Sequence, residues 1–410
     1  MSLMEEVGRI LEYGDVCDHC LGRFYGRRSF GLTNKDRGSA LRIAYYLHAN
    51  LPFHSHEGPC WICGDLFAAV PAWAGRVVHA TEGIEFSTFL IGTRVPPLMA
   101  ESEEMVWSDL GLGGSEALKS EMNREVGKAV SELTGKSADL SHPEVVIILD
   151  LQHGVVEVQI SPLFIYGRYR KFERGIPQTH WDCRVCRGAG CERCNFTGKM
   201  YPDSVEELIG RPVTEFFGAE SAVLHGAGRE DIDARMVGTG RPFVLEVVSP
   251  RRRSVDLHAL EELINEQAKE RVSVSSLRWS RRDEVEIIKS HKGYKKYRIL
   301  IEVESPLSRN ELQSAIEALK GVKIEQRTPQ RVAHRRADLV RERKVLDIEF
   351  IGEEQGRYLL EVTGEAGLYI KELISGDNGR TRPSLAEILG RPAQVCTLDV
   401  VQVEGFTDGE

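Results

Sequence analysis

Eight of the nine cysteines of this 410-residue chain form four Cys-x-x-Cys pairs, and this pattern constrains the fold more than any other feature. The pairs are Cys17 with Cys20, Cys60 with Cys63, Cys183 with Cys186, and Cys191 with Cys194. Thiols of a cytoplasmic protein stay reduced, so paired cysteines at this spacing indicate metal ligands rather than disulfides. Taken four at a time, the cysteines predict two tetrahedral zinc sites.

The first set of four cysteines encloses 39 residues between Cys20 and Cys60. This connection is long enough to hold a helix expected at 37–50 and to return the second pair to the first. His19 lies within the first pair, but four thiolates complete a zinc site without it. Because a closed site leaves no free thiolate, we expect a structural zinc and no redox activity.

The second set is more compact, with only four residues between Cys186 and Cys191. Gly188 and Gly190 lie in this connection and permit the tight turn that ligation of a single structural zinc requires. Cys396 remains outside both sets and is predicted to be a small buried side chain.

Length and composition are typical of a globular protein with two or three domains, since 41% of the residues are hydrophobic and 28% are charged. No apolar run is long enough to span a membrane, and the first residues lack the pattern of a signal peptide, so we expect a cytoplasmic protein. The net charge of -9 argues against a uniformly basic surface. It is compatible with a local basic patch that binds nucleic acid.

Strand and helix patterns do not alternate strictly, which favours an α+β fold with a mixed, largely antiparallel sheet. Helices are expected at 5–13, 37–50, 115–135, 256–270 and 309–320, with a further helix beginning after Ser204. Strands are expected at 77–80, 87–92, 144–151, 154–160, 222–226, 243–248, 273–278, 284–289, 297–304, 346–351, 357–363 and 395–404. Changes of pattern divide the chain into four segments, 1–65, 66–180, 181–200 and 201–410.

The segment 228–243 is the strongest candidate for a catalytic loop. It lies between two apolar runs and contains Asp231, Asp233, Arg229, Arg235, Arg241, Gly238 and Gly240. A polar loop held by a sheet is a frequent position for catalytic groups, and its glycines let a ligand come close. The alternative is a surface turn with local Asp–Arg pairs, and the segment alone does not decide between the two.

Three later segments combine features suited to RNA. Tyr297 follows a cluster of three lysines and is placed to stack on a base. The segment 327–344 holds seven Arg or Lys residues against two acidic ones, a local patch able to neutralise phosphates. Further on, Tyr369 and Lys371 share one side of a strand or first helical turn, with Ile370 facing the other way. A core tyrosine and a solvated surface are the alternatives.

In an earlier segment, 162–174, four basic residues interleave with three of its aromatic residues: Arg168, Arg170, Lys171 and Arg174 with Tyr166, Tyr169 and Phe172. This mixture favours contact with a nucleic-acid backbone and unpaired bases. The alternative is a strand whose aromatic side chains belong to the core.

The loop at Asp231, the strand that Tyr297 opens and the segment ending at Lys371 together resemble the three sequence motifs of pseudouridine synthases. More narrowly, the chain resembles the archaeal Pus10 type of tRNA pseudouridine synthase. This narrower resemblance rests on the amino-acid sequence of 228–243, the basic run within 327–344 and the N-terminal cysteine pairs. The resemblance extends over nearly the whole chain. It implies that 1–65 is a zinc-binding segment, 66–180 a THUMP-containing RNA-binding domain, 181–200 a four-Cys knuckle and 201–410 the catalytic domain.

The resemblance also implies the chemistry: isomerisation of uridine to pseudouridine at positions 54 and 55 of the TΨC arm of tRNA, without an organic cofactor. Asp231 would be the nucleophile, and Lys371 its basic partner. The residues that would bind the substrate are Tyr297, Tyr369, Ile370, Leu398, Arg229, Arg335 and Arg336. Asp233 would pair with Arg229 or Arg235. Zinc would be structural, and a monomer would hold the TΨC arm and acceptor region of tRNA.

Two other functions compete with this one. A tRNA methyltransferase or thiouridine synthetase needs a loop for a nucleotide or methyl donor, and no Gly-rich turn from strand to helix is present to provide it. A zinc-ribbon RNA-binding protein, such as a tRNA chaperone, would explain the cysteines and the basic segments. It would leave Asp231 and Lys371 without a role.

Overall fold

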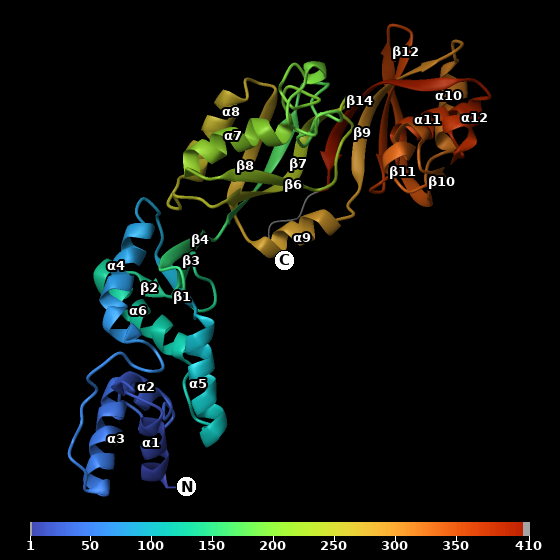
Figure 1. Ribbon diagram of the computed structural model, residues 1–410. Helices are drawn as coiled ribbons and strands as arrows, with labels where there is room; N and C mark the ends of the chain where they lie inside the picture. The colour runs from blue at the N-terminus through green and yellow to red at the C-terminus, as the bar shows by residue number, and fades with distance from the viewer. Residues whose placement is uncertain (1, 405–410) are drawn as a thin grey trace. The chain divides into compact units, whose positions relative to one another are not determined.

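The structure, a computed structural model, describes residues 2–404, with the side chain of Arg335 outside the described part. The chain forms two compact units: Met1–Ser161 with Arg251–Arg253, and Pro162–Pro250 with Ser254–Glu410. They are called unit 1 and unit 2 (Figure 1). Among the described helices, none has both the length and the hydrophobicity of a membrane span.

Unit 1 begins with short helices around the first four cysteines. The elements are α1 (Leu3–Glu12), α2 (Asp18–Arg23), α3 (Asn34–Ala49), η1 (Leu66–Ala69) and α4 (Val70–Ala80). Ser2 starts α1 with a capping box that includes Glu5. Cys17 caps α2, because its sulfur accepts a hydrogen bond from the backbone N–H of Cys20. The helix expected at 37–50 is confirmed as α3.

The rest of unit 1 is a four-stranded sheet in the order β2-β1-β3-β4, with α4 and α6 packed together against it. The bounds are β1 (Thr88–Arg94), α5 (Pro97–Leu110), α6 (Leu118–Thr134), β2 (Ser137–Ala138), β3 (Val145–Asp150) and β4 (Val155–Ile160). β3 and β4 form the expected antiparallel hairpin. The strand expected at 77–80 is wrong, because these residues end α4. There Trp73, Ala74 and Val77 share one buried face at helical spacing.

Unit 2 is built on one ten-stranded sheet in the order β13-β10-β11-β12-β9-β14-β7-β5-β8, with β6 paired to β7. The strands are β5 (Leu163–Lys171), β6 (Ser221–Gly226), β7 (Arg235–Val248), β8 (Val272–Ser280), β9 (Lys295–Val303), β10 (Lys323–Arg327), β11 (Val340–Glu354), β12 (Arg357–Gly364), β13 (Thr381–Arg382) and β14 (Ala393–Val403). Every pairing between these strands is antiparallel except that of β7 with β14. The expected mixed, largely antiparallel sheet is therefore confirmed.

Helices flank this sheet along its length. They are α7 (Val205–Phe217), α8 (Leu257–Gln267), α9 (Arg282–Ser290), α10 (Arg309–Glu317), α11 (Ile370–Ser375) and α12 (Leu385–Leu389). α7 and α8 pack against β6 and β8, whereas α10, α11 and α12 gather at the other end (Figure 1). The strand expected at 284–289 is wrong. In α9, Val285 and Ile288 are buried while Ile287 is exposed. Buried residues spaced three apart are typical of a helix, whereas a strand would bury every second residue.

The segment 162–174 also differs from expectation. β5 lies between β7 and β8 in unit 2, whereas the sequence pattern grouped residues up to 180 with the preceding domain. Tyr166, Tyr169 and Lys171 are buried, so the core alternative holds for these three. Phe172 is exposed beside Arg170. Cys396, expected in the core, is exposed on β14.

The two halves of the large sheet meet at a narrow parallel junction. β14 pairs with β7 at only two positions, Asp399 opposite Arg235 and Val400 opposite Met236. Asp399 reinforces this junction, because its carboxylate accepts hydrogen bonds from Arg235 Nε at 3.0 Å and from Arg174 Nη2 at 2.5 Å. Arg174 also donates to the backbone oxygens of Asp233 and Leu398. The cluster thus ties the segment before β7 to β14.

Replacement of Asp399 by Asn should weaken this junction in a pH-dependent way. Burial raises the pKa of Asp399, but hydrogen bonds from Arg235 and Arg174 and their charges outweigh burial, and the pKa is lowered. A lowered pKa stabilises the fold above the unfolded value of about 4, and this stabilisation is lost as the pH falls further. We expect Asp399→Asn to cost about 1–2 kcal/mol at pH 7, since both arginines are partly exposed, and less at pH 3. Urea unfolding at the two pH values measures the difference, and an equal cost at both would contradict the assignment.

Candidate active site

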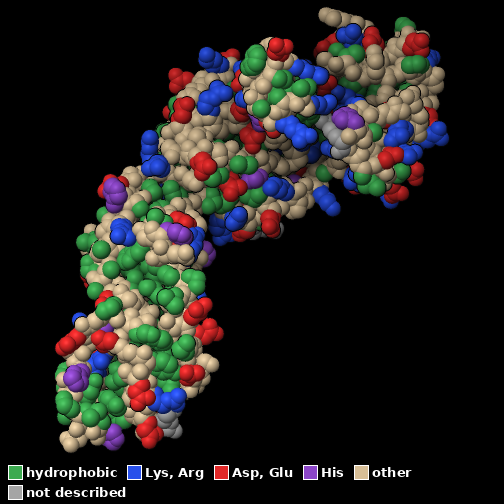
Figure 2. Space-filling view, in the orientation of Figure 1, with side chains coloured by type: hydrophobic (Ala, Val, Ile, Leu, Met, Phe, Trp, Pro, Cys, Tyr) green, Lys and Arg blue, Asp and Glu red, His purple; other side chains and the backbone are tan. Residues whose placement is uncertain are grey.

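A cavity of about 600 Å³ opens in unit 2 beside the junction of β7 and β14. Its walls come from the loop before β7, from β9, β11 and β14, and from the loop and first turn of α11. The described residues that line it include nine Lys or Arg and only two acidic ones, Glu230 and Asp231. Figure 2 shows groups of Lys and Arg on the visible face of unit 2. This acidic protein therefore carries a local basic cavity suited to a polyanion.

Asp231 lies in the loop between β6 and β7, with its side chain 31% exposed. One carboxylate oxygen accepts a hydrogen bond from Arg331 Nη1 at 3.0 Å. The other lies 3.7 Å from Lys371 Nζ. The loop turns back at once, because the N–H of Ala234 donates to the Asp231 carbonyl. The loop is shorter than the predicted segment 228–243, because β7 already begins at Arg235.

Lys371 is closer to the second carboxylate of the loop than to the first. Its Nζ donates to Asp233 Oδ2 at 2.6 Å. Burial raises the pKa of Asp233, but the hydrogen bond and charge of Lys371 prevail and lower it. The expected pairing of Asp233 with Arg229 or Arg235 is wrong, because Arg229 lies over the Trp181 ring and Arg235 binds Asp399. Lys371 bridges the two carboxylates instead.

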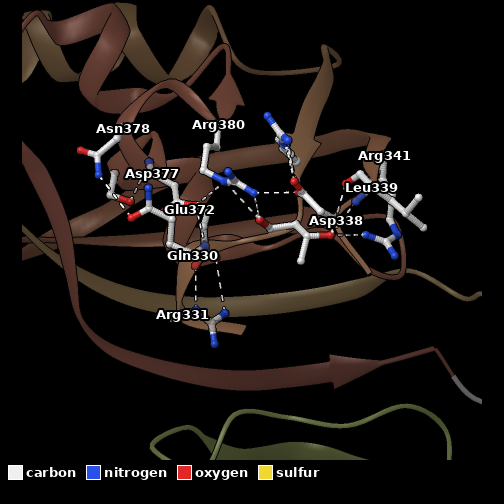
Figure 3. A network of polar contacts seen from close by, with 12 residues as sticks. Gln330, Arg331, Asp338, Leu339, Arg341, Glu372, Asp377, Asn378 and Arg380 are labelled. Atoms are coloured by element: carbon white, nitrogen blue, oxygen red, sulfur yellow. Dashed lines mark hydrogen bonds and ion pairs between the residues drawn. The ribbon is translucent and has the colours of Figure 1, made fainter. Parts of the chain in front are cut away.

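Arg331 is the nearest cation to Asp231 and was not singled out from the sequence. It lies in η3 (Gln330–Arg335), within the predicted basic segment 327–344. Its Nε donates to Glu372 Oε1 at 2.7 Å, so Glu372 of α11 orients the guanidinium (Figure 3). Burial lowers the pKa of Arg331, yet the hydrogen bond to Glu372 and the charges of Asp231 and Glu372 raise it overall. Arg331 thus remains a cation beside Asp231.

The η3 loop is held at its base by a polar network (Figure 3). Asp338 accepts hydrogen bonds from Arg327 Nε at 2.9 Å and from Arg380 Nη2 at 2.8 Å. The backbone N–H of Gln330 donates to Asp377 at 3.0 Å. Segments far apart in the sequence therefore fix the position from which Arg331 reaches the cavity.

The aromatic and apolar residues predicted at the site also line the cavity. Tyr297 of β9 is 9% exposed, and burial raises its pKa to about 12, with the Arg241 charge opposing and that of Asp231 adding. Tyr369 caps α11, where its backbone exchanges two hydrogen bonds with the buried side chain of Gln326. Ile370 and Leu398 are buried and contribute apolar surface. Ile370 thus lines the cavity with Tyr369 and Lys371 instead of facing away.

Of the three arginines predicted to bind substrate, two line the cavity. Arg229 does so with its guanidinium over the Trp181 ring at 5.0 Å. Arg336 does so while Nη1 donates to the hydroxyl of Tyr369 at 2.8 Å. Arg335 ends the η3 turn, but its side chain lies outside the described part of the structure.

A buried polar network supports the Asp231 loop from below. The Glu230 carboxylate accepts hydrogen bonds from Tyr169 Oη at 2.9 Å and Arg241 Nε at 2.9 Å. Arg241 Nη1 also donates to the Ala227 carbonyl at 2.7 Å, and Gln178 Nε2 donates to the Gly228 carbonyl at 3.0 Å. Glu230 and Arg241 belong to the predicted segment 228–243. The sequence pattern of this segment did not indicate that their side chains are buried. Because Glu230 precedes Asp231, its anchoring fixes the loop.

Arg241→Met should test this support. The change removes the closer of the two cations beside buried Glu230 and leaves only Lys171, whose Nζ lies 3.9 Å from the carboxylate. We expect a loss of about 3–5 kcal/mol of unfolding free energy. The double variant Glu230→Gln with Arg241→Met removes both charges and should recover part of that loss. Urea unfolding measures both, with Arg252→Met at an exposed position as the control, expected within about 0.5 kcal/mol of the parent protein. A double variant that is less stable than Arg241→Met would contradict a charge-pair support.

Both sets of four cysteines come together in space. In each set the four sulfur atoms lie within 4.8 Å of one another. The Cys17 and Cys63 sulfurs are 3.7 Å apart, and the Cys191 and Cys194 sulfurs are also 3.7 Å apart. A tetrahedral site with Zn–S bonds of about 2.3 Å has sulfur–sulfur edges of about 3.8 Å. Each set therefore fits a metal ion with four thiolate ligands.

Comparison with known proteins gives consistent matches along the chain. The sequence profile described as "Pus10, C-terminal" matches residues 164–404, and the profile "Pus10 THUMP domain, archaeal" matches residues 73–150. Proteins named "tRNA pseudouridine synthase Pus10" are 47% identical in Methanothrix thermoacetophila and 38% identical in Pyrococcus furiosus. Both matches cover 100% of this chain. They cover 96% of the Methanothrix protein and 100% of the Pyrococcus protein.

One solved structure, described as "Crystal Structure of a Cbf5-Nop10-Gar1 Complex", is 18% identical and covers 48% of this chain and 44% of that one, with a TM-score of 0.31. The family assignment does not depend on so low a score. It depends on the profile that spans more than half of the chain and on the relatives above 30% identity along its whole length. The resemblance noted from the motifs is therefore confirmed, and the chain belongs to the Pus10 family of tRNA pseudouridine synthases.

Proposed function

We propose that this chain isomerises uridine to pseudouridine at positions 54 and 55 of the TΨC arm of tRNA, with Asp231 as the nucleophile. The observation that carries the proposal is the different situation of the two carboxylates of the cavity. Glu230 is buried and bound by Tyr169 and Arg241, whereas Asp231 is partly exposed to the cavity. Asp231 is thus the carboxylate that a bound nucleotide can reach.

The chemistry of the reaction fits these residues. The base must leave the sugar through its nitrogen and return through carbon 5, and a carboxylate serves as nucleophile or stabilises the sugar meanwhile. Arg331 and Lys371 hold the Asp231 carboxylate from two sides. Two cations therefore face the carboxylate that serves as the nucleophile. The reaction needs no organic cofactor.

The walls of the cavity suit an everted nucleotide. A uridine within a folded arm must leave its stack before a side chain can reach its sugar. Tyr297 and Tyr369 offer aromatic surfaces for the base, and Ile370 and Leu398 offer apolar ones. Cations such as Arg336 are placed to meet phosphates. Unit 1, with its THUMP domain, would hold the acceptor region of the same tRNA.

We infer that both metal sites hold zinc and that its role is structural. Four thiolates complete the coordination of zinc and leave no open position for a substrate. The first set lies in the hydrophobic core of unit 1 and the second in the knuckle of unit 2. Neither set contributes a residue to the cavity.

Incubation of the protein with an unmodified tRNA transcript, without any added cofactor, tests the proposal. Pseudouridine mapped at positions 54 and 55 is the expected result, and transcripts with cytidine at one of the two positions separate the two activities. Product only in the presence of a methyl donor or ATP would favour a different tRNA-modifying enzyme. Binding without product would leave a zinc-containing tRNA-binding protein.

A further inference from the structure

Lys295 lines the proposed catalytic cavity. It is the first residue of β9 and lies two positions before Tyr297, so both side chains point to the same face of the sheet. Its Nζ lies only 2.9 Å from the point that a Cβ on Gly228 would occupy. Only glycine at 228, with a φ of +75°, lets the amine approach the Asp231 loop this closely.

The amine of Lys295 forms no hydrogen bond or ion pair with any residue of the described part of the chain. The charges of Arg241 and Glu230 act on it, and these two side chains are already bound to each other. Burial and the charge of Arg241 lower the pKa of Lys295 to about 7, although Glu230 opposes them. A partly buried amine next to a second cation is a known way to obtain a lysine whose pKa lies near physiological pH.

Other charged and titratable groups face the same cavity. Asp231 and Tyr297 lie on the elements nearest to Lys295, Lys289 and His291 come from α9 and the residue after it, and Arg341 and Arg343 come from β11. These six side chains and Arg241 include five Lys, Arg or His residues and one carboxylate. The surroundings therefore favour the neutral amine over the ammonium.

The proposed reaction requires a proton acceptor that the residues discussed above do not supply. When carbon 5 of the base bonds to C1′, its hydrogen must leave as a proton. Asp231 is occupied as the nucleophile. Tyr297, with a pKa of about 12, keeps its own proton at neutral pH. On β9, Lys295 lies two positions before Tyr297, lines the cavity and holds no hydrogen bond or ion pair among the described residues, so its amine is available to accept the proton.

We propose that Lys295 is the general base that removes the proton from carbon 5 of the target uracil, an inference that rests on the proposed function. The C5–H bond breaks, its electron pair restores the double bond of the ring, and the proton passes to the Lys295 amine. N1, freed from the sugar, takes up one proton from solvent, and the Lys295 ammonium returns its proton to solvent. The reaction remains an isomerisation and needs no oxidant, reductant or co-reactant.

Single-turnover kinetics with saturating protein and tRNA transcript test this role. Lys295→Met should slow pseudouridine formation by about 100-fold or more with tRNA affinity within about threefold. Lys295→Arg should be equally slow, because arginine keeps the charge but does not accept a proton at these pH values. Lys320→Met, an exposed lysine outside the cavity, serves as the control.

Three further readouts separate proton transfer from a structural role. The parent rate should rise with pH through an inflection near 7, and this inflection should vanish in Lys295→Met. A uridine deuterated at carbon 5 should react more slowly than the protonated one in Lys295→Met, with a larger isotope effect than in the parent. Added methylamine should restore part of the rate of Lys295→Ala, and urea unfolding should show that the variants are folded.

Full rate in Lys295→Met, or recovery in Lys295→Arg, would overturn the inference and assign the amine a purely electrostatic role or none. In that case a large isotope effect in Tyr297→Phe would make Tyr297 the base. Absence of product with the parent protein would instead remove the proposed function itself. The two failures are thus distinguishable.

Discussion

Asp231→Asn is expected to reduce pseudouridine formation by about four orders of magnitude or more at both uridines, with little change in tRNA affinity. Asparagine keeps the shape of the side chain and can still face Arg331, but it is neither an anion nor a nucleophile. Most cations of the cavity are untouched, so the phosphates should still be held. Single-turnover rates and a filter-binding titration measure the two quantities.

Asp233→Asn is the matched control for this prediction. Asp233 is more exposed than Asp231, with 67% of its side chain accessible, and it does not line the cavity. Its loss frees Lys371 to move closer to Asp231, and we expect an effect of about tenfold or less. Activity that survives in Asp231→Asn but disappears in Asp233→Asn would make Asp233 the nucleophile.

Loss of the first metal site should unfold much of unit 1. Cys17, Cys20, Cys60 and Cys63 are buried in the same hydrophobic cluster as α1, α2 and α4. A structural zinc contributes on the order of 10 kcal/mol to folding, which is comparable to the whole stability of a domain. We expect Cys60→Ser to lose one zinc per chain, to lose helical circular dichroism and to expose residues before 160 to proteases.

Two comparisons sharpen this prediction. Cys396→Ser changes an exposed thiol outside both sets and should leave zinc content and stability unchanged. Cys191→Ser removes a ligand from the knuckle, where three of the four cysteines are only partly buried, so its effect should stay local. A parent protein without zinc by elemental analysis would contradict both metal assignments.

Much of the fold could be predicted because its signals are local. Two short runs rich in β-branched residues identified β3 and β4, and a capping pair identified the start of α7 at Ser204. The errors fall where the local signal is short or ambiguous. The run at 77–80 and the segment 284–289 are too short for alternation to be told from helical spacing.

The site shows the same division between local and non-local information. Asp231, Tyr297 and Lys371 could be found because each lies in a recognisable motif, and the structure places all three around one cavity. Arg331 and Lys295 could not be chosen from the many basic residues near them. What distinguishes them is distance to the Asp231 loop, and this depends on strands and loops that lie far apart in the sequence.

The sequence by itself determined the cysteine sets, the type of fold and the family motifs, because spacing and periodicity are properties of neighbouring residues. Only the tertiary structure decided which cation meets which carboxylate. Lys371 binds Asp233 more closely than Asp231, and Arg331 takes the place beside Asp231. The physical reason is that ion pairing falls off over a few ångströms, and such distances are set by the packing of β7, β9, β14 and α11 around the cavity.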